Sequence, residues 1–262
     1  MGVDVGAFLT ALLFVGGAIA YAVIGVLVGR RYNHGRVREG HNDVLVPLFL
    51  TAGVIYAVLL GFMVVAVWES YDAAHANAAE EAATLVPLYR TTYDMAPEKG
   101  AGMRKLLRAY AETVVNDEWD SIRETGHASE KARKISGDVL RLYGTLSPST
   151  KIKEIVDAQF LATYSQVLVD RNKRLLQASE QLSWIMWFGV IAGAIIVIGM
   201  SFALFMERAV LQVAMTGVMA ALIGTSLFMM NVLNRPFVGP VAIEPAPFES
   251  TLKIFDDVDR GN

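Results

Sequence analysis

The sequence predicts an all-α, polytopic membrane protein with four transmembrane helices and a helical extramembrane bundle. Of its 262 residues 54% are hydrophobic, and the mean hydropathy of +0.41 exceeds that of a typical soluble domain. The apolar residues gather in four blocks, each long enough to cross about 30 Å of hydrocarbon and free of charge in its interior. Between the second and third blocks, apolar residues recur at helical spacing and no alternating strand pattern is visible. The four blocks are Phe8–Val28, Val44–Trp68, Trp184–Met206 and Ala209–Val232.

The first block is expected to be a retained span and not a cleaved signal peptide. The residues before it include Asp4 and no Lys or Arg, and its apolar stretch is longer than that of a typical signal sequence. The last two blocks each carry a pair of glycines, which suits close packing between helices. These pairs are Gly189 with Gly193, and Gly217 with Gly224.

Basic residues near the span ends indicate an orientation in a bacterial inner membrane. Lys and Arg accumulate in short cytoplasmic loops, and two connections expected on the same side carry arginines. These are Arg30, Arg31, Arg36 and Arg38 between the first two spans, and Arg208 between the last two. This arrangement favours an extracytoplasmic extramembrane domain. Three basic residues shortly before the third span leave the opposite orientation open, namely Arg171, Lys173 and Arg174.

The extramembrane bundle is expected to consist partly of extensions of the second and third spans. No helix breaker follows Trp68, so the second span should continue to about Tyr93, shortly before Pro97. Two further helices follow, and a long helix capped by Ser149 or Thr150 should run directly into the third span.

The chain therefore divides into four predicted parts. Residues 1–68 hold the first two transmembrane helices with their Arg-rich loop, and residues 69–183 form the extramembrane helical domain. Residues 184–232 hold the last two transmembrane helices, and residues 233–262 form a Pro-rich extended tail.

Several classes of function are disfavoured by the residues that are missing. The chain has no cysteine, its four histidines are scattered, and neither a Gly-rich phosphate loop nor a nucleophile elbow occurs, so neither an enzyme nor a metal or cofactor site is expected. No basic stripe suggests nucleic-acid binding. The spans carry no ionisable residue in their interiors, which disfavours active transport. A passive pore and a non-conducting scaffold remain.

Residues of the second span fit an apolar gate. Val54, Val58 and Phe62 recur every four residues, and a ring of such side chains around a symmetry axis closes a pore by dewetting. The same spacing also fits a helix that faces lipid or its neighbours. Glu69 and Asp72 share a helix face at the end of the span, where they would concentrate cations at a pore mouth or form a solvated surface.

Two motifs carry a resemblance to bestrophins. Leu59–Phe62 followed by Trp68–Tyr71 resembles the second-span motif of that family, and Asn234–Gly239 resembles its Asn-Pro-Phe-Gly element with two insertions. The order of two spans, helical domain, two spans and tail also matches. More specifically, the chain is similar to bacterial bestrophin-like membrane proteins, a family of unknown function.

The resemblance implies a homo-oligomer in a lipid bilayer, a pentamer by analogy, that passes inorganic anions through an axial pore lined by the second span. Val54, Val58 and Phe62 then correspond to the neck of the pore. Bestrophins carry a calcium-binding acidic cluster beside the Pro-Phe element and hold their helical domain in the cytosol; here the cluster is missing, so no calcium site is expected. The alternative is a non-conducting, membrane-anchored scaffold or sensor that binds a partner through its extramembrane bundle.

Overall fold

The computed structural model describes residues 5–33, 41–146, 150–204 and 206–261. Within these ranges it contains helices and no strand, which confirms the predicted all-α class. Four helical segments are long and apolar enough to cross a membrane: Val5–Tyr32, Asn42–Thr91, Trp184–Ala203 and Ala209–Leu233. The chain divides into two compact units, which are described separately: a membrane unit, Met1–Ser70 with Gln181–Arg235, and an extramembrane unit, Tyr71–Glu180 with Pro236–Asn262.

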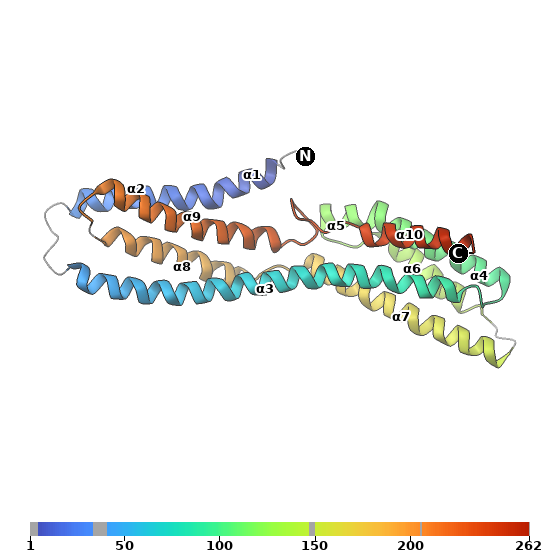
Figure 1. The fold of residues 1–262 in the computed structure, drawn as a ribbon. Coiled ribbons are helices and arrows are strands. Elements are labelled where there is room, and N and C mark those ends of the chain that lie inside the picture. The colour runs from blue at the N-terminus through green and yellow to red at the C-terminus, as the bar shows by residue number, and fades with distance from the viewer. Residues whose placement is uncertain (1–4, 34–40, 147–149, 205, 262) are drawn as a thin grey trace. The chain divides into compact units, whose positions relative to one another are not determined.

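The membrane unit contains the apolar parts of the four candidate spans, and Figure 1 labels the helices that form them. The first span is built from α1 (Val5–Ala11), the π-helical turn η1 (Leu12–Gly16) and α2 (Gly17–Asn33). The second is the first part of α3 (His41–Thr91), and the last two are α8 (Trp184–Ala203) and α9 (Ala209–Leu233).

Close helix packing in the membrane unit depends on glycine. A Cβ atom at Gly224 would lie 2.8 Å from the carbonyl oxygen of Phe14, so η1 and α9 meet backbone to backbone. A Cβ at Gly25 would lie 2.1 Å from the Phe202 ring, which packs α2 against the end of α8. Of the glycines predicted to serve packing, Gly193 and Gly224 contact another helix, whereas Gly189 and Gly217 face open space.

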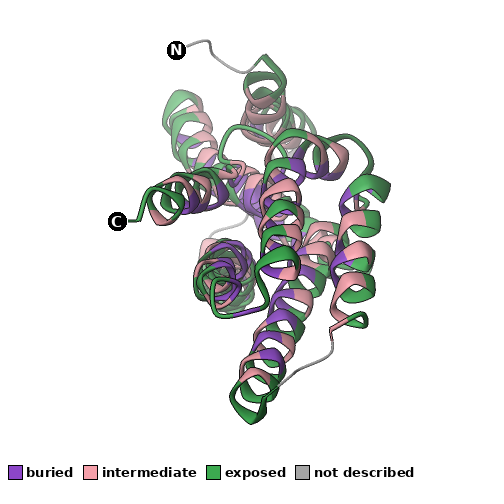
Figure 2. Ribbon diagram, turned by 90° about the vertical axis from the view of Figure 1, so that its right-hand side faces the viewer, coloured by how far each residue is buried: buried purple, intermediate pink, exposed green. Residues whose placement is uncertain are grey.

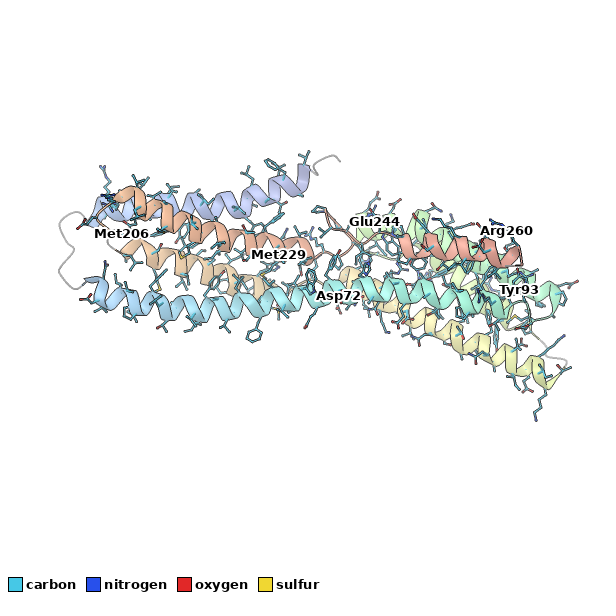
Figure 3. All side chains as sticks on the ribbon, viewed as in Figure 1. Asp72, Tyr93, Met206, Met229, Glu244 and Arg260 are labelled. Atoms are coloured by element: carbon cyan, nitrogen blue, oxygen red, sulfur yellow. The ribbon has the colours of Figure 1, made fainter. Side chains whose placement is uncertain are left out.

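Arginine fastens one end of the membrane unit. Arg30 donates hydrogen bonds to the carbonyl oxygens of Met206 (2.8 Å) and Glu207 (3.3 Å) and to Gln212 Oε1 (2.9 Å). Met206 is labelled at this end in Figure 3. The end of α2 that carries Arg30 and the turn before α9 therefore share one end of the unit. Arg36 and Arg38 lie outside the described residues.

The extramembrane unit is a helical bundle. It contains the second part of α3 together with α4 (Pro97–Thr113), η2 (Val114–Glu118), α5 (Trp119–Thr125), α6 (Glu130–Tyr143), α7 (Lys151–Ser179) and α10 (Ala246–Asp259). Ser129 caps α6 and Thr150 caps α7 through their side-chain oxygens, as expected for these residue types. Figure 2 shows the buried residues of the bundle in purple, and Leu85, Leu88, Trp119, Phe160 and Phe248 are among them.

The predicted extension of the second span is confirmed, whereas the predicted direct connection of the preceding helix to the third span is wrong. Helix α3 passes Trp68 without interruption and ends at Thr91, within two residues of the expected position. Helix α7, in contrast, ends at Ser179, and residues 180–183 are not helical before α8 begins. Asn234 Oδ1 accepts a hydrogen bond from the backbone N–H of Leu182 at 2.8 Å, which satisfies a backbone group that the interruption frees.

The predicted extended tail is also wrong for 14 of its 30 residues. Residues 246–259 form α10, with Pro245 before its first turn and Pro247 within it, where proline does not interrupt helical hydrogen bonds. Phe248, Thr251 and Phe255 lie three and four residues apart and are buried in the bundle core. The sequence prediction of an extended tail depended on its high proline content. Burial of this apolar face stabilises the helix more than the prolines, which lie at its start, disfavour it.

Candidate pore-lining face of α3

The three predicted gate residues lie on α3 where the membrane unit does not cover it. Their exposed fractions are 64% for Val54, 54% for Val58 and 72% for Phe62. Tyr56 and Val67 point the other way and are buried at 5% and 2%. Other α3 side chains in this unit, such as Ile55, are also exposed, so exposure here does not by itself separate a pore from lipid.

The exposed side of α3 continues beyond the membrane unit as one stripe. Residues at steps of three and four along the helix stay within about a quarter of a turn of one another, and every member of this series is exposed. We call it the exposed face; it consists of Pro47, Thr51, Val54, Val58, Phe62, Val65, Glu69, Asp72, Ala76, Glu80, Ala83, Pro87 and Arg90.

The exposed face changes chemistry along its length. It is apolar from Val54 to Val65 and then carries the carboxylates of Glu69, Asp72 and Glu80. Asp72 is labelled on α3 in Figure 3. Its single basic residue, Arg90, lies at the far end of the helix. The predicted mouth residues Glu69 and Asp72 therefore lie on the same face as the predicted gate.

The opposite side of α3 packs against α8 at Gly193, where the missing side chain leaves a notch in the helix surface. A Cβ at Gly193 would lie 2.5 Å from Cδ2 of Tyr56, so the tyrosine ring occupies space that only glycine leaves free. Val190, Ala194 and Val197 of α8 belong to the same buried cluster as Tyr56. Sequence reasoning missed this contact. The small-residue step at Gly189 and Gly193 indicated a packing site, and nothing local indicated that a side chain of α3 fills it.

The far end of α3 is held by α10. The hydroxyls of Tyr89 (2.9 Å) and Tyr93 (2.5 Å) donate to the Asp259 carboxylate, and Arg108 pairs with Asp256 at 2.7 Å and with Asp259 at 3.0 Å. Desolvation raises the pKa of Asp259, but the hydrogen bonds from Tyr93, Tyr89 and Arg108 outweigh it and hold the pKa below its ordinary value.

These contacts give two aspartates near the C-terminus, Asp256 and Asp259, a structural role. The Phe255 ring also stacks on Tyr89 with ring centroids 3.9 Å apart. Figure 3 labels Tyr93 and Arg260 near the ends of the two helices. Across the described residues, no group of three or more His, Cys, Asp or Glu side chains is arranged to hold a metal ion.

Comparison with protein families identifies the fold. The model of the Bestrophin-like domain matches residues 16–248, which is most of the chain. The chain belongs to the Bestrophin-like family. A search of curated proteins finds no match.

Solved structures agree with this family. A variant of the bacterial bestrophin homologue from Klebsiella pneumoniae superposes with a TM-score of 0.76 and 12% identity, covering 95% of this chain and 98% of its own. A second structure of that homologue gives a TM-score of 0.73 and 14% identity, with coverage of 94% and 97%. A structure described as a membrane protein gives a TM-score of 0.75 and 12% identity, with coverage of 94% and 97%.

This bestrophin-like protein is thus a multi-pass membrane protein with the bestrophin fold. At these identities the structures show the fold alone, and the roles of individual side chains have to come from the geometry of this chain.

Proposed function

We propose that the protein is a homo-oligomeric ion channel, a pentamer by analogy with bestrophins, in which α3 of each copy lines an axial pore. The observation that carries this proposal is the exposed face of α3, which runs without interruption from Pro47 to Arg90. Without a pore, the two parts need separate surroundings, lipid for the apolar part and bulk water for the acidic part. A water-filled axis accounts for both, because copies of one helix around an axis turn the same face inward along their whole length.

The apolar part of the exposed face supplies the proposed gate. Val54, Val58 and Phe62 would form successive rings, and narrow apolar rings exclude water and ions unless they widen. Phe62 has the largest side chain of the three and is the most exposed at 72%. We therefore place the narrowest point at Phe62 and the mouth of the pore at Glu69 and Asp72.

Anions are the permeant ions that the family resemblance supports. A second candidate, cation permeation, is favoured by the three carboxylates of Glu69, Asp72 and Glu80 on the exposed face. Fixed negative charge in a narrow path raises the local concentration of cations and lowers that of anions. The reversal potential across a potassium chloride gradient distinguishes the two, since its sign reports which ion carries the current.

The test of the gate is a pair of truncations recorded in planar bilayers. Phe62→Ala and Val58→Ala should raise single-channel conductance or open probability, because each removes apolar bulk from the constriction. Val218→Ala on α9 is the matched control, since this valine is 62% exposed and is not on α3. Currents that do not change with either α3 variant, or no current from any protein, would count against the channel and favour the non-conducting scaffold.

A further inference from the structure

Four ionised side chains form a buried cluster inside the extramembrane unit, away from the exposed face. Glu81 comes from α3, Glu118 from the end of η2, and Arg171 and Arg174 from α7. Arg171 is 7% exposed and the other three are fully buried. Their formal charges cancel, so the cluster as a whole is neutral.

The two carboxylates of the cluster are fully engaged. Arg174 donates from Nε to Glu81 Oε2 at 2.7 Å and from Nη2 to Glu81 Oε1 at 3.1 Å and Glu118 Oε1 at 2.7 Å. Arg171 Nη2 donates to Glu118 Oε2 at 2.5 Å. The hydroxyl of Tyr110 on α4 donates to Glu81 Oε1 at 2.6 Å. The cluster therefore joins α3, α4, η2 and α7 through directional bonds.

The cluster is buried beside aromatic side chains. The Arg174 guanidinium lies 5.0 Å from the ring centroid of Trp119 and 5.6 Å from that of Phe248. Burial, followed by the charge of Glu81, raises the pKa of Tyr110 well above its ordinary value. Burial alone lowers the pKa of Arg174, but Glu81 and Glu118 more than offset this, so the guanidinium stays charged.

Stability alone does not account for such a cluster. Removing each ion from water costs several kcal/mol, and buried ion clusters replaced by apolar side chains of similar volume often leave stability unchanged or raised. Arg174 Nη1 and Arg171 Nε are also buried with no hydrogen-bond partner in the part of the chain that the structure describes. What the charges supply, beyond burial, is a fixed direction for each contact.

Helix α3 needs such directional contacts because its packing surface is shallow here. Before Glu81 in this unit the buried α3 residues are Ala74 and Ala78, and Ala82 follows it directly; the larger Leu85 and Leu88 are buried only further along the helix. Alanine side chains form lower ridges on a helix surface than larger side chains do, so they interlock less with a neighbouring helix and resist rotation less. Asn77, which donates to Gln177 Oε1 at 3.0 Å, is another polar link between α3 and α7.

We propose that the buried cluster fixes the rotation of α3 about its own axis, with Glu81 as the positioning residue. Successive helical residues are turned by about 100° from each other, so holding Glu81 inward holds its neighbour Glu80 on the exposed face. Because helix α3 is continuous, fixing its rotation at Glu81 also determines which of its side chains face the proposed pore. The consequence for conduction rests on the proposed function; the rotation itself does not.

Cysteine accessibility tests the rotation without any current. The chain has no native cysteine, so Ala82→Cys, at a buried position, and Ala83→Cys, at an exposed one, report the two sides of α3. Adding Glu81→Gln to each should raise the rate of thiol modification at position 82 at least about tenfold, equivalent to about 1.4 kcal/mol, and lower it at position 83. Glu130→Gln, which removes an exposed carboxylate paired with Arg133, should change neither rate.

Unchanged rates would overturn the proposal. A rise at both positions would overturn it as well, because it would show local unfolding instead of rotation. Absence of current from the native protein would contradict the channel and leave the rates at positions 82 and 83 as a valid test of rotation.

A second variant separates positioning from folding. The whole cluster is replaced by apolar side chains, with the Tyr110 hydroxyl removed because it loses its acceptor: Glu81→Met, Glu118→Leu, Arg171→Leu, Arg174→Met and Tyr110→Phe. We expect a melting temperature equal to or above that of the native protein. We also expect cysteines at positions 82 and 83 to lose the difference in their rates of thiol modification. If both the melting temperature and the difference in modification rate between positions 82 and 83 stayed at their native values, apolar packing would suffice and the charges would not position α3.

Discussion

Glu80 and Glu81 are neighbours in the chain and lie in opposite environments. Glu80 is exposed on the face that we assign to the pore, whereas Glu81 is fully buried and receives three hydrogen bonds. Two identical side chains thus serve different purposes because the helix turns by about 100° between them. Nothing in their residue types distinguishes them, so the sequence alone does not separate their roles.

The gate candidates show what a sequence can predict at the scale of single residues. A four-residue period places Val54, Val58 and Phe62 on one face, and the structure places all three on exposed helix. The contact that holds the opposite side of α3 was not predictable. There Tyr56 packs against Gly193, which lies on a helix more than a hundred residues later in the chain. Periodicity is a local property, whereas a notch depends on which helix lies opposite.

Asp259 provides a prediction for one residue. Asp259→Asn should lower the melting temperature at pH 7 by about 2–4 °C, in keeping with a partly exposed ion pair worth about 1 kcal/mol. The folded-state pKa lies below the ordinary value of 3.8, so the carboxylate stabilises the fold above that pH and loses its effect as the pH falls through the lowered pKa.

Thermal melting from pH 7 to pH 2.5 tests the role of Asp259. The native protein and the variant should differ at neutral pH and converge below 3.8. Glu249→Gln, at an exposed glutamate on the same helix, is the control. A difference that persists at the acidic end would show that Asp259 does not stabilise through its charge.

At the scale of elements, the sequence predicts features that depend on neighbouring residues and does not predict features that depend on contacts between distant parts of the chain. The spans were found because hydropathy over about 20 residues is sufficient to mark them. The interruption between α7 and α8 was missed because it is coupled to Asn234 by a hydrogen bond across 52 residues of sequence. Helix α10 was missed because its helix face, with Phe248 and Phe255, is stabilised by a bundle that the tail cannot reveal by itself.

The continuity of α3 gives a prediction for one element. Cysteines at Val65 and Ala83, both exposed, lie 18 residues apart on α3. A straight helix separates their Cα atoms by about 27 Å, at 1.5 Å per residue. Spin labels at these positions, in samples diluted with unlabelled protein, should give one narrow distance distribution near that value.

A broad or markedly shorter distribution would indicate a hinge near Trp68. It would break the connection between the acidic and apolar parts of the exposed face, on which the proposed pore depends.

At the scale of the whole molecule, we propose an orientation in the bacterial inner membrane. The arginines of the first connection, with Arg30 fastened to the turn before α9, favour an extracytoplasmic extramembrane unit. The resemblance to bestrophins, whose helical domain is cytosolic, favours the reverse. We retain the extracytoplasmic orientation because short loops carry the strongest charge signal.

Labelling of intact cells tests this orientation. His127 is exposed in the extramembrane unit, and His127→Cys provides the only thiol of the chain. A membrane-impermeant maleimide should label this variant in cells whose outer membrane has been permeabilised. Labelling only after the inner membrane is opened would place the unit in the cytoplasm.

The central claim is that copies of α3 surround an axis. Single-particle imaging of the purified full chain in lipid nanodiscs tests it most directly. We predict a closed ring of five copies in which Val58 and Phe62 face the axis. A monomer or dimer, or a ring whose α3 helices turn Phe62 toward lipid, would contradict the account.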